Sequence, residues 1–250
     1  MIQLLFDYSL VFFLFFAVSI VYSSIGFGGG SSYLAILALT TITFTQIRTT
    51  SLLCNLFVVS GNVLYYYRHN QLDLKKTIPI VSLSIPFAFL GGYLKINETI
   101  FFILLGTLLI LASIMMWYSK KNKTDYSKNN RIKNSFIGGI IGFFSGIVGI
   151  GGGIFLAPTL HLSNWDTTKK IASTSSLFIL LNSLAGLLGQ FYNPNFTINW
   201  TLTLILLLTV LIGGQIGRSI SQKKLTSNQI KKITSLLIGY VGIKILVGLF

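Results

Sequence analysis

The sequence predicts an all-α integral membrane protein made of two inverted repeats. Of its 250 residues, 52% are hydrophobic and only 10% are charged, and the mean hydropathy is +0.76. A glycine-rich pentapeptide at residues 26–30 returns at residues 149–153. The cations also cluster in short loops between apolar stretches. Because a soluble domain carries about a quarter charged residues, this composition indicates a chain embedded in a bilayer.

Eight hydrophobic segments organise the chain, and each approaches or exceeds the roughly 20 residues that span a bilayer as a helix. They cover residues 2–40, 48–66, 77–94, 98–118, 134–162, 171–191, 198–217 and 233–250. The longest polar stretch, Lys120 to Lys133, lies between them. We therefore expect a first membrane repeat at 1–118, a linker at 119–133 and a second repeat at 134–250. A solvated loop of no other significance fits the linker equally well.

The repeat rests on several matches in the same order. A shift of 123 positions superposes Gly26-Phe27-Gly28-Gly29-Gly30 on Gly149-Ile150-Gly151-Gly152-Gly153. Other matches then fall nearby: Thr50-Ser51-Leu52 with Thr174-Ser175-Ser176-Leu177, Gly91-Gly92 with Gly213-Gly214, and Gly106 with Gly239. Glycine weakens a helix by about 1 kcal/mol per residue, and lipid cannot satisfy freed backbone groups. Both motifs therefore predict broken helices buried inside the protein.

The cations decide how the segments cross the membrane. If all eight segments crossed, nine cations would face each side, and the cytoplasmic excess of cations that the positive-inside rule describes would be missing. If segments 2–40 and 134–162 instead turn at their glycines as hairpins, each repeat has one hairpin and three full spans. Sixteen cations then share one face, which leaves only Arg48 and Lys95 on the other. This predicts inverted repeats in the cytoplasmic (inner) cell membrane, with the linker in the cytoplasm.

Several other classes of protein and site are disfavoured. The formal charge of +14 lies in loops that fix membrane orientation, so we expect no nucleic-acid partner. No Lys or Arg precedes the first apolar run, which does not match a cleaved signal peptide. The single Cys54 excludes an intramolecular disulfide and any multi-cysteine metal site. His69 and His161 lie at segment ends, so we expect no metal and no cofactor.

A helix that restarts after a glycine turn presents unpaired N–H groups and the positive end of its dipole, which suits an anion. Ser31 and Ile154 are expected to begin two such half-helices, and hydroxyls and amides on the next helices can donate to an oxyanion. The candidate substrate-binding residues are Gly26, Gly28, Gly29, Gly30, Ser31, Ser32, Thr50, Ser51, Asn55, Gly149, Gly151, Gly152, Gly153, Ser175, Ser176 and Asn182. Tight helix packing by the glycines, and hydroxyls that only join helices, are the alternatives.

Cations at comparable places in the two halves precede the polar helices. Arg48 lies before one, and Lys169 and Lys170 lie before the other. They can attract anions to the two mouths of a pathway by long-range attraction. Interfacial anchoring is the alternative interpretation. Lys244 lies close enough to the end of the last segment to reach the interface.

These motifs resemble the sulfite exporter TauE/SafE family, also called the toluene sulfonate uptake permease family. The resemblance rests on the two glycine motifs, on Pro158 after the second, and on the Thr/Ser clusters that begin the next helices. It covers nearly the whole chain and implies a permease for small, often sulfur-containing anions. Ala35 stands where the first repeat would match Pro158, and Ser31-Ser32 stands opposite Ile154-Phe155. The two hairpins are therefore expected to differ chemically.

The sequence thus favours a secondary transporter that moves a small sulfur-containing anion, such as sulfite or an organosulfonate, by alternating access. A passive anion channel and a membrane-embedded enzyme are the alternatives; the second lacks a nucleophile with a nearby base. Carboxylate-based proton coupling is not supported, since all five acids fall at segment ends or in loops: Asp7, Asp73, Glu98, Asp125 and Asp166. The expected partners are this anion, membrane lipids, a coupling ion of unknown identity and a second copy of the chain.

Overall fold

The computed structural model describes residues 8–24, 26–118, 130–194, 196–220 and 227–248. In this part of the chain all regular structure is helical, in ten helices. They are α2 (Ser9–Ser24), α3 (Gly30–Leu37), α4 (Phe44–Arg68), α5 (Leu74–Tyr93), α6 (Glu98–Tyr118), α7 (Arg131–Val148), α8 (Gly153–Leu162), α9 (Thr168–Phe191), α10 (Trp200–Ile220) and α11 (Ser227–Val247). Five of them, α4, α5, α6, α9 and α10, are long and apolar enough to cross a membrane. The chain is therefore an all-α membrane protein, as predicted.

Both glycine motifs interrupt a helix, as their composition predicts. α2 ends at Ser24 and α3 begins at Gly30, whereas α7 ends at Val148 and α8 begins at Gly153. Gly29 and Gly152 precede the restarting helices with φ of +86° and +80°, a left-handed conformation that side chains disfavour. The half-helices begin one residue earlier than the expected Ser31 and Ile154. Glycine at these turns is thus a conformational requirement.

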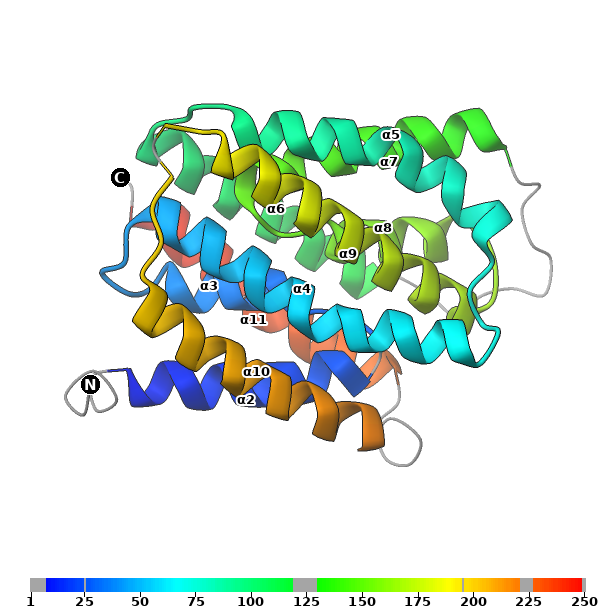
Figure 1. The fold of residues 1–250 in the computed structure, drawn as a ribbon, viewed down its shortest axis with the longest axis horizontal. Coiled ribbons are helices and arrows are strands. Elements are labelled where there is room, and N and C mark those ends of the chain that lie inside the picture. Colours follow the sequence, from blue (N-terminus) through cyan, green and yellow to red (C-terminus); the bar gives the residue numbers. More distant parts are fainter. Residues whose placement is uncertain (1–7, 25, 119–129, 195, 221–226, 249–250) are drawn as a thin grey trace.

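The two broken segments return to opposite ends of the bundle (Figure 1). α2 begins and α3 ends at the left of the view, where α4 starts. α7 begins and α8 ends at the right, where α9 starts. Both termini of the described chain lie at the left. Each broken segment therefore forms a hairpin whose tip lies inside the bundle.

The helices pack in matching pairs when α2–α6 are superposed on α7–α11. α5 contacts α7 as α10 contacts α2, and α5 contacts α9 as α10 contacts α4. α3 contacts α11 as α8 contacts α6, while α4 and α9 contact each other, as do α6 and α11. α5 and α7 pack so closely that a side chain on either of two glycines of α7 would clash with α5. A Cβ on Gly138 would lie 2.1 Å from the carbonyl oxygen of Ile80, and a Cβ on Gly146 would lie 2.2 Å from that of Ala88. For these glycines, tight helix packing is the role that the structure supports.

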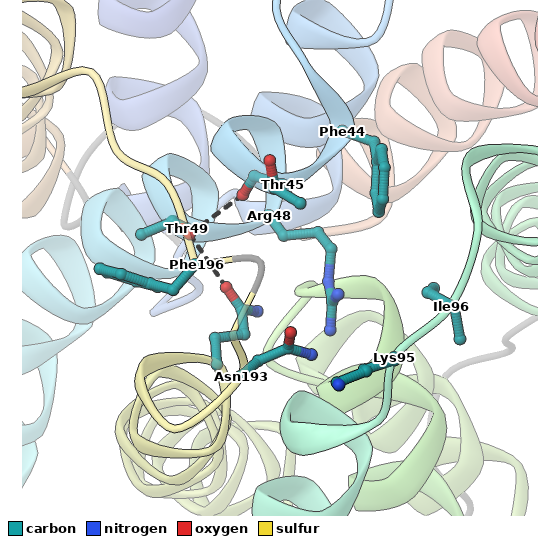
Figure 2. A pocket seen from close by; sticks show the side chains of 9 residues that line it. Phe44, Thr45, Arg48, Thr49, Lys95, Ile96, Asn193 and Phe196 are labelled. Atoms are coloured by element: carbon teal, nitrogen blue, oxygen red, sulfur yellow. Dashed lines mark hydrogen bonds between the residues drawn. The ribbon is translucent and has the colours of Figure 1, made fainter.

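One end of the bundle carries few cations, and we call it the low-charge end. It contains the loops 38–43, 94–97 and 192–194 with 196–199, and the start of α4. Thr45 and Thr197 join two of these segments through their hydroxyls, 2.6 Å apart. Figure 2 shows Arg48, on α4, pointing toward Lys95 and Asn193 at this end. Arg48 and Lys95 are the cations of its pocket.

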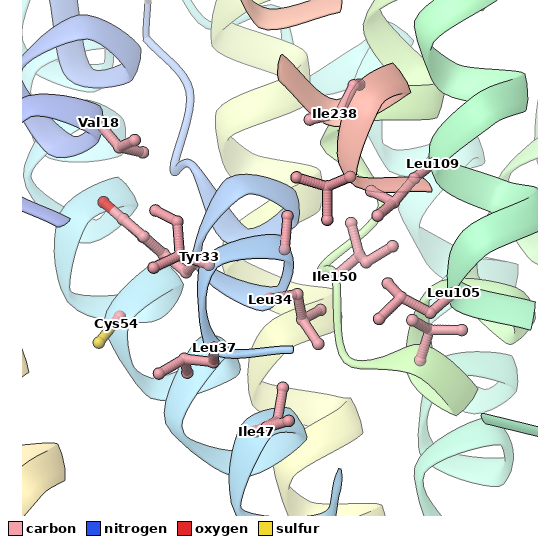
Figure 3. Packing of buried hydrophobic residues seen from close by; sticks show 14 of the residues in the cluster. Val18, Tyr33, Leu34, Leu37, Ile47, Cys54, Leu105, Leu109, Ile150 and Ile238 are labelled. Carbon is pink, nitrogen blue, oxygen red and sulfur yellow. The ribbon is translucent and has the colours of Figure 1, made fainter. Parts of the chain in front are cut away.

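Between the two ends lies a hydrophobic core centred on the half-helix α3. Figure 3 shows Tyr33, Leu34 and Leu37 of α3 in this core, with Leu105 and Leu109 on α6 and Ile238 on α11. Phe15 of α2 stacks on Tyr33 with ring centroids 4.6 Å apart. Cys54 is fully buried in the same cluster, which fits packing rather than thiol chemistry. The core thereby holds a helix of only eight residues in a fixed place.

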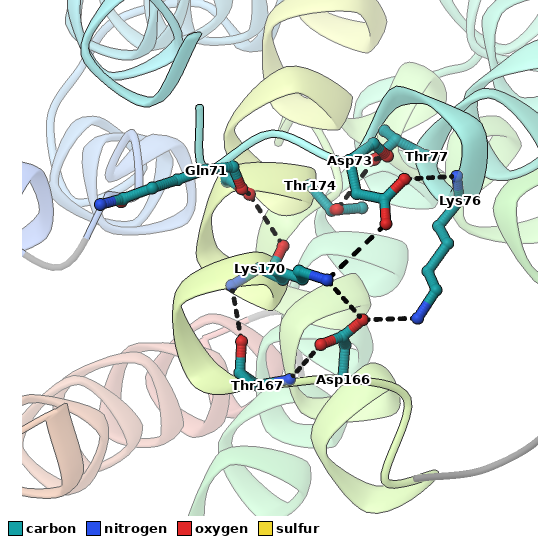
Figure 4. A network of polar contacts seen from close by, with 9 residues as sticks. Gln71, Asp73, Lys76, Thr77, Asp166, Thr167, Lys170 and Thr174 are labelled. Atoms are coloured by element: carbon teal, nitrogen blue, oxygen red, sulfur yellow. Dashed lines mark hydrogen bonds and ion pairs between the residues drawn. The ribbon is translucent and has the colours of Figure 1, made fainter. Parts of the chain in front are cut away.

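The opposite end carries most of the cations, and we call it the high-charge end. Its described cations are Arg68, Lys75, Lys76, Arg131, Lys133, Lys169, Lys170, Arg218 and Lys232. Ion pairs join two of its corners (Figure 4): Lys76 Nζ lies 2.6 Å from Asp166 Oδ2, and Lys170 Nζ lies 3.6 Å from the same oxygen and 3.7 Å from Asp73 Oδ2. The α4–α5 corner is therefore tied to the α8–α9 corner by paired charges.

Candidate functional site

A cavity lies between the two glycine breaks. Its lining comes from both breaks and from α2, α3, α4, α6, α8 and α9: Tyr22, Phe27, Gly28, Gly29, Gly30, Ser31, Asn55, Met116, Ile150, Gly153, Ile154, Ala157, Pro158 and Ile179. Its free volume is about 20 Å³, which is room for about one water molecule. We call it the central cavity.

Asn55 connects the two breaks. Its Oδ1 accepts a hydrogen bond from the backbone N–H of Gly30 at 3.2 Å. Its Nδ2 donates to the carbonyl of Ile150 at 3.0 Å and to the hydroxyl of Ser183 at 3.4 Å. Ser51, one turn earlier on α4, donates to the carbonyl of Gly30 at 2.8 Å. The Asn55 amide thus links the backbone of the first break to the backbone of the second.

Gly29 and Gly152, which precede α3 and α8, have no side chain to cap these half-helices, although Asn55 accepts a hydrogen bond from the first N–H of α3. The first N–H groups of a helix have no partner within the helix, and the N-terminus carries a partial positive charge. Ser31 and Ile154, each the second residue of its half-helix, line the central cavity. Two helix N-termini therefore contribute to the wall of one cavity, an arrangement that suits a bound anion.

The side chains of the cavity are unequal on its two sides. The first break contributes Ser31 and is contacted by Asn55. The second break contributes Ile154 and is contacted by Ile179, whose Cδ1 and Cγ1 would lie 2.2 and 2.4 Å from a Cβ on Gly153. Ala157 and Pro158 extend this apolar wall. The expected chemical difference between the hairpins is therefore present in the cavity itself.

Six of the predicted substrate-binding residues line the central cavity: Gly28, Gly29, Gly30, Ser31, Asn55 and Gly153. The remaining ones lie around it without lining it: Gly26, Ser32, Thr50, Ser51, Gly149, Gly151, Gly152, Ser175, Ser176 and Asn182. Ser32 is 2.8 Å from the hydroxyl of Tyr22, and Asn182 donates to Ser84 at 3.0 Å. The site hypothesis for these residues stays a prediction.

The Thr/Ser clusters mainly join helices. The hydroxyls of Thr50 and Thr203 lie 3.0 Å apart, and those of Thr174 and Thr77 lie 2.9 Å apart, so the two halves make matching bonds. Ser176 donates to the carbonyl of Gly26 and thereby holds the first break. These contacts favour, for the threonines, the alternative interpretation of hydroxyls as links between helices.

Sequence reasoning missed most of the apolar lining, notably Tyr22, Met116 and Ile179. A signal for Ile179 was available, because it is the twelfth residue of α9 as Asn55 is the twelfth of α4. No comparable signal marks Met116, which belongs to a uniformly apolar helix with 21 residues.

The predicted anion-attracting cations differ in their surroundings. Arg48 is only 3% exposed and lines the pocket at the low-charge end with Thr45, Thr49, Lys95, Gln190 and Asn193, among others. Lys170 is paired with Asp73 and Asp166, and Lys169 is exposed. Burial alone would raise the pKa of Asp166, but hydrogen bonds from Lys76 and the Thr167 N–H, with the charge of Lys170, lower it below its ordinary value.

No group of three or more potential metal ligands occurs among the described residues. The acids with described positions, Asp73, Glu98 and Asp166, lie at the ends of the bundle. The central cavity is lined by neutral groups only. It can therefore bind an anion through N–H and O–H donors without a fixed charge beside it.

Comparisons with known proteins show the family of the chain. The family model "Sulfite exporter TauE/SafE" matches residues 11–245. The chain is 32% identical over 241 residues to "Probable membrane transporter protein y4hK" of Sinorhizobium fredii, which covers 93% of this chain and 95% of the relative. It is 26% identical over 248 residues to "Probable membrane transporter protein YunE" of Bacillus subtilis, which covers 87% and 90%. No solved structure matches the chain significantly.

Proposed function

This chain belongs to the sulfite exporter TauE/SafE family, and from that premise we propose that it is a secondary transporter for a small sulfur-containing anion. The anion binds in the central cavity, and alternating access exposes the cavity to each side of the cytoplasmic membrane in turn. The carrying observation is the pair of half-helices, α3 and α8, whose first turns line one cavity and whose breaks are joined by Asn55.

The matching helix contacts support an inverted-repeat mechanism. Each half supplies one hairpin and three longer helices, and the hairpins leave from opposite ends of the bundle (Figure 1). In transporters with inverted repeats, the substrate binds near the midplane, where broken helices of the two repeats meet. The central cavity has this position relative to the two breaks.

The charge distribution supports the orientation. Nine described cations lie at the high-charge end, whereas Arg48, Lys95 and Lys244 belong to the low-charge half of the molecule. The positive-inside rule then assigns the high-charge end to the cytoplasm. Part of the predicted 119–133 linker, residues 119–129, lies outside the described residues, and its cytoplasmic position stays a prediction.

The cavity chemistry favours a sulfonate or sulfite group with its oxygens toward Ser31. The apolar wall of Ile154, Ala157 and Ile179 then accommodates the carbon substituent of an organosulfonate. Export of the anion can be driven by membrane potential alone, at roughly 2.3 kcal/mol per charge per 100 mV. Uptake needs a coupling ion.

Counterflow in proteoliposomes tests the proposal. Vesicles loaded with unlabelled sulfite or methanesulfonate are expected to take up the same labelled anion faster than empty vesicles, because a carrier returns its site faster when it is loaded. A passive anion channel gives no such stimulation. Chemical conversion of a supplied anion, without its transport, would instead support a membrane enzyme.

Cysteine labelling tests the topology separately. In a Cys54→Ala background, Asn70→Cys and Asn164→Cys, which lie in the corners of the high-charge end, are expected to react from the same face. Thr43→Cys, at the low-charge end, serves as the opposite-face control. Reaction of the two corner positions from different faces would rule out the inverted arrangement.

A further inference from the structure

Arg48 is a buried cation among uncharged polar groups and Lys95. It lies on the second turn of α4 and is 3% exposed. Its Nη2 lies 3.4 Å from the carbonyl oxygens of Gly92 and Gly146, near the C-terminal ends of α5 and α7. The C-terminal end of a helix carries a partial negative charge, so these long contacts suit a cation, but the carbonyl groups themselves are neutral. The full charge of the guanidinium is therefore not neutralised by them.

No carboxylate compensates this charge in the described part of the chain. The pocket contains Lys95 and no acid, and no ion pair involves Arg48 or Lys95 there. Arg48 Nε and Gln190 Nε2 are buried donors without a partner, although Gln190 Oε1 accepts from Thr49 at 3.0 Å. Buried charges and buried donors without partners are costly, so native proteins normally pair them. A bound anion would satisfy all of these groups together.

We propose that Arg48, Lys95 and Gln190 form a second binding site, which holds a small oxyanion of the sulfonate or sulfite type at the low-charge end. Figure 2 shows Arg48 and Lys95 pointing toward each other beside Asn193, and Lys95 is exposed to solvent. Arginine offers several N–H groups in one plane, which match the oxygens of such an anion. The site is separate from the central cavity, because the two share no lining residue.

The position of this second site suggests that it takes part in transport. That role rests on the proposed function, whereas the binding of an anion at the site does not. Arg48, Ser51 and Asn55 are spaced i, i+3 and i+7, so they follow one face of α4 from this pocket to the central cavity. Seven residues of helix rise about 10 Å. An anion bound at Arg48 is thus about two helical turns from the central cavity, and the second site binds the anion before it enters this cavity.

Site-resolved acylation of the wild-type protein tests the binding. The protein in an uncharged detergent is treated with uncharged N-hydroxysuccinimidyl acetate, and the rate at each lysine is measured by mass spectrometry. Methanesulfonate is expected to slow acylation of Lys95 at least threefold relative to chloride at equal ionic strength. Lys75, exposed at the high-charge end, is the internal control and should react at the same rate in both salts.

A matched pair of variants tests the residues. Gln190→Glu keeps the acceptor for Thr49 but replaces the free donor with a negative charge, so protection of Lys95 should disappear. Gln71→Glu adds the same charge at the high-charge end and should leave the protection intact. Comparing rates with and without methanesulfonate within each variant removes any change in the intrinsic reactivity of Lys95.

Equal acylation of Lys95 in both salts overturns the second site and leaves the transport proposal standing. Protection only by phosphatidylglycerol vesicles, and not by methanesulfonate, also overturns it, because the pocket would then bind a lipid phosphate. If wild-type protein fails to transport but shows the protection, the proposed function falls and the site remains. If it transports, Gln190→Glu should raise the KM for anion added at the low-charge face about tenfold.

Discussion

The two glycine breaks share a backbone design and differ in the side chains around it. Gly26 and Gly149 have φ of +84° and +87°, and Gly29 and Gly152 have φ of +86° and +80°. Gly151 also has a positive φ, whereas Gly28, which occupies the matching position in the first motif, does not. The twelfth residue of the following helix, however, is Asn55 in the first repeat and Ile179 in the second.

The backbone conformation is thus common to the two repeats, whereas the side chains that contact the breaks differ. Both breaks need glycine, because each turns into a half-helix through a left-handed residue. Only the first break has an amide that holds its N–H and reaches across to the second. We infer that the first break orients the charged group of the ligand, whereas the second supplies apolar contact.

The largest effect is expected for Asn55→Leu. It leaves the Gly30 N–H and the Ile150 carbonyl without their partner, at about 1–3 kcal/mol for each unsatisfied buried group. Thermal unfolding in detergent should therefore show a clear loss of stability, and transport should be abolished. Ile179→Leu, the control at the matching position, conserves volume and should cost less than about 1.5 kcal/mol. Equal losses in the two variants would show that the breaks do not differ.

The second comparison concerns Gly30→Ala and Gly153→Ala. A Cβ on Gly30 would lie 2.6 Å from both the Ile150 carbonyl oxygen and Asn55 Nδ2, and this carbonyl belongs to the backbone. A Cβ on Gly153 meets only the Ile179 side chain, which can rotate away. We expect Gly30→Ala to destabilise by about 1–3 kcal/mol and Gly153→Ala by less, as measured by thermal unfolding.

Adding Ile179→Val to Gly153→Ala removes a methyl group from the obstructing side chain and should recover part of the loss. If Gly153→Ala is the more damaging of the single variants, or if Ile179→Val gives no recovery, the proposed difference in packing at the two breaks is wrong.

The third comparison concerns ligand affinity. Ser31→Ala removes one hydroxyl from the polar side of the central cavity, and the loss of one hydrogen bond costs about 0.5–1.5 kcal/mol. The Kd for both sulfite and an alkylsulfonate should rise by up to about tenfold in a thermal-shift titration. Ile154→Ala should weaken binding of the alkylsulfonate and leave that of sulfite nearly unchanged. An identical effect of Ile154→Ala on both ligands would contradict the assignment of an apolar side.

The smallest effect, and no difference between the halves, is expected for Thr50→Val and Thr174→Val. Each variant loses one hydroxyl pair between helices, with Thr203 or with Thr77, at about 0.5–1.5 kcal/mol. Thermal unfolding should show similar shifts, and the KM for the anion should not change. A raised KM in Thr50→Val alone would return this residue to the substrate site.

Much of the candidate site was predictable because glycine has a direct physical meaning. Several glycines inside an apolar segment break a helix, and a broken helix in a membrane must be buried, so the positions of both breaks followed from the sequence. The hydroxyl clusters were not resolved in this way. A serine or threonine in a helix can bond to a carbonyl, to a neighbouring helix or to a ligand, and its local sequence is the same in each case.

The sequence by itself determined the membrane class, the two broken helices and the family, because composition, glycine content and motif order are local properties of the chain. Only the tertiary structure decided that Asn55 joins residues 30 and 150, that Thr50 pairs with Thr203, and that Arg48 is buried with no counter-charge among the described residues. These contacts link positions on different helices, from 25 to more than 150 residues apart. Helical periodicity gives the face of a residue, but its partner depends on how the helices are rotated and packed against one another.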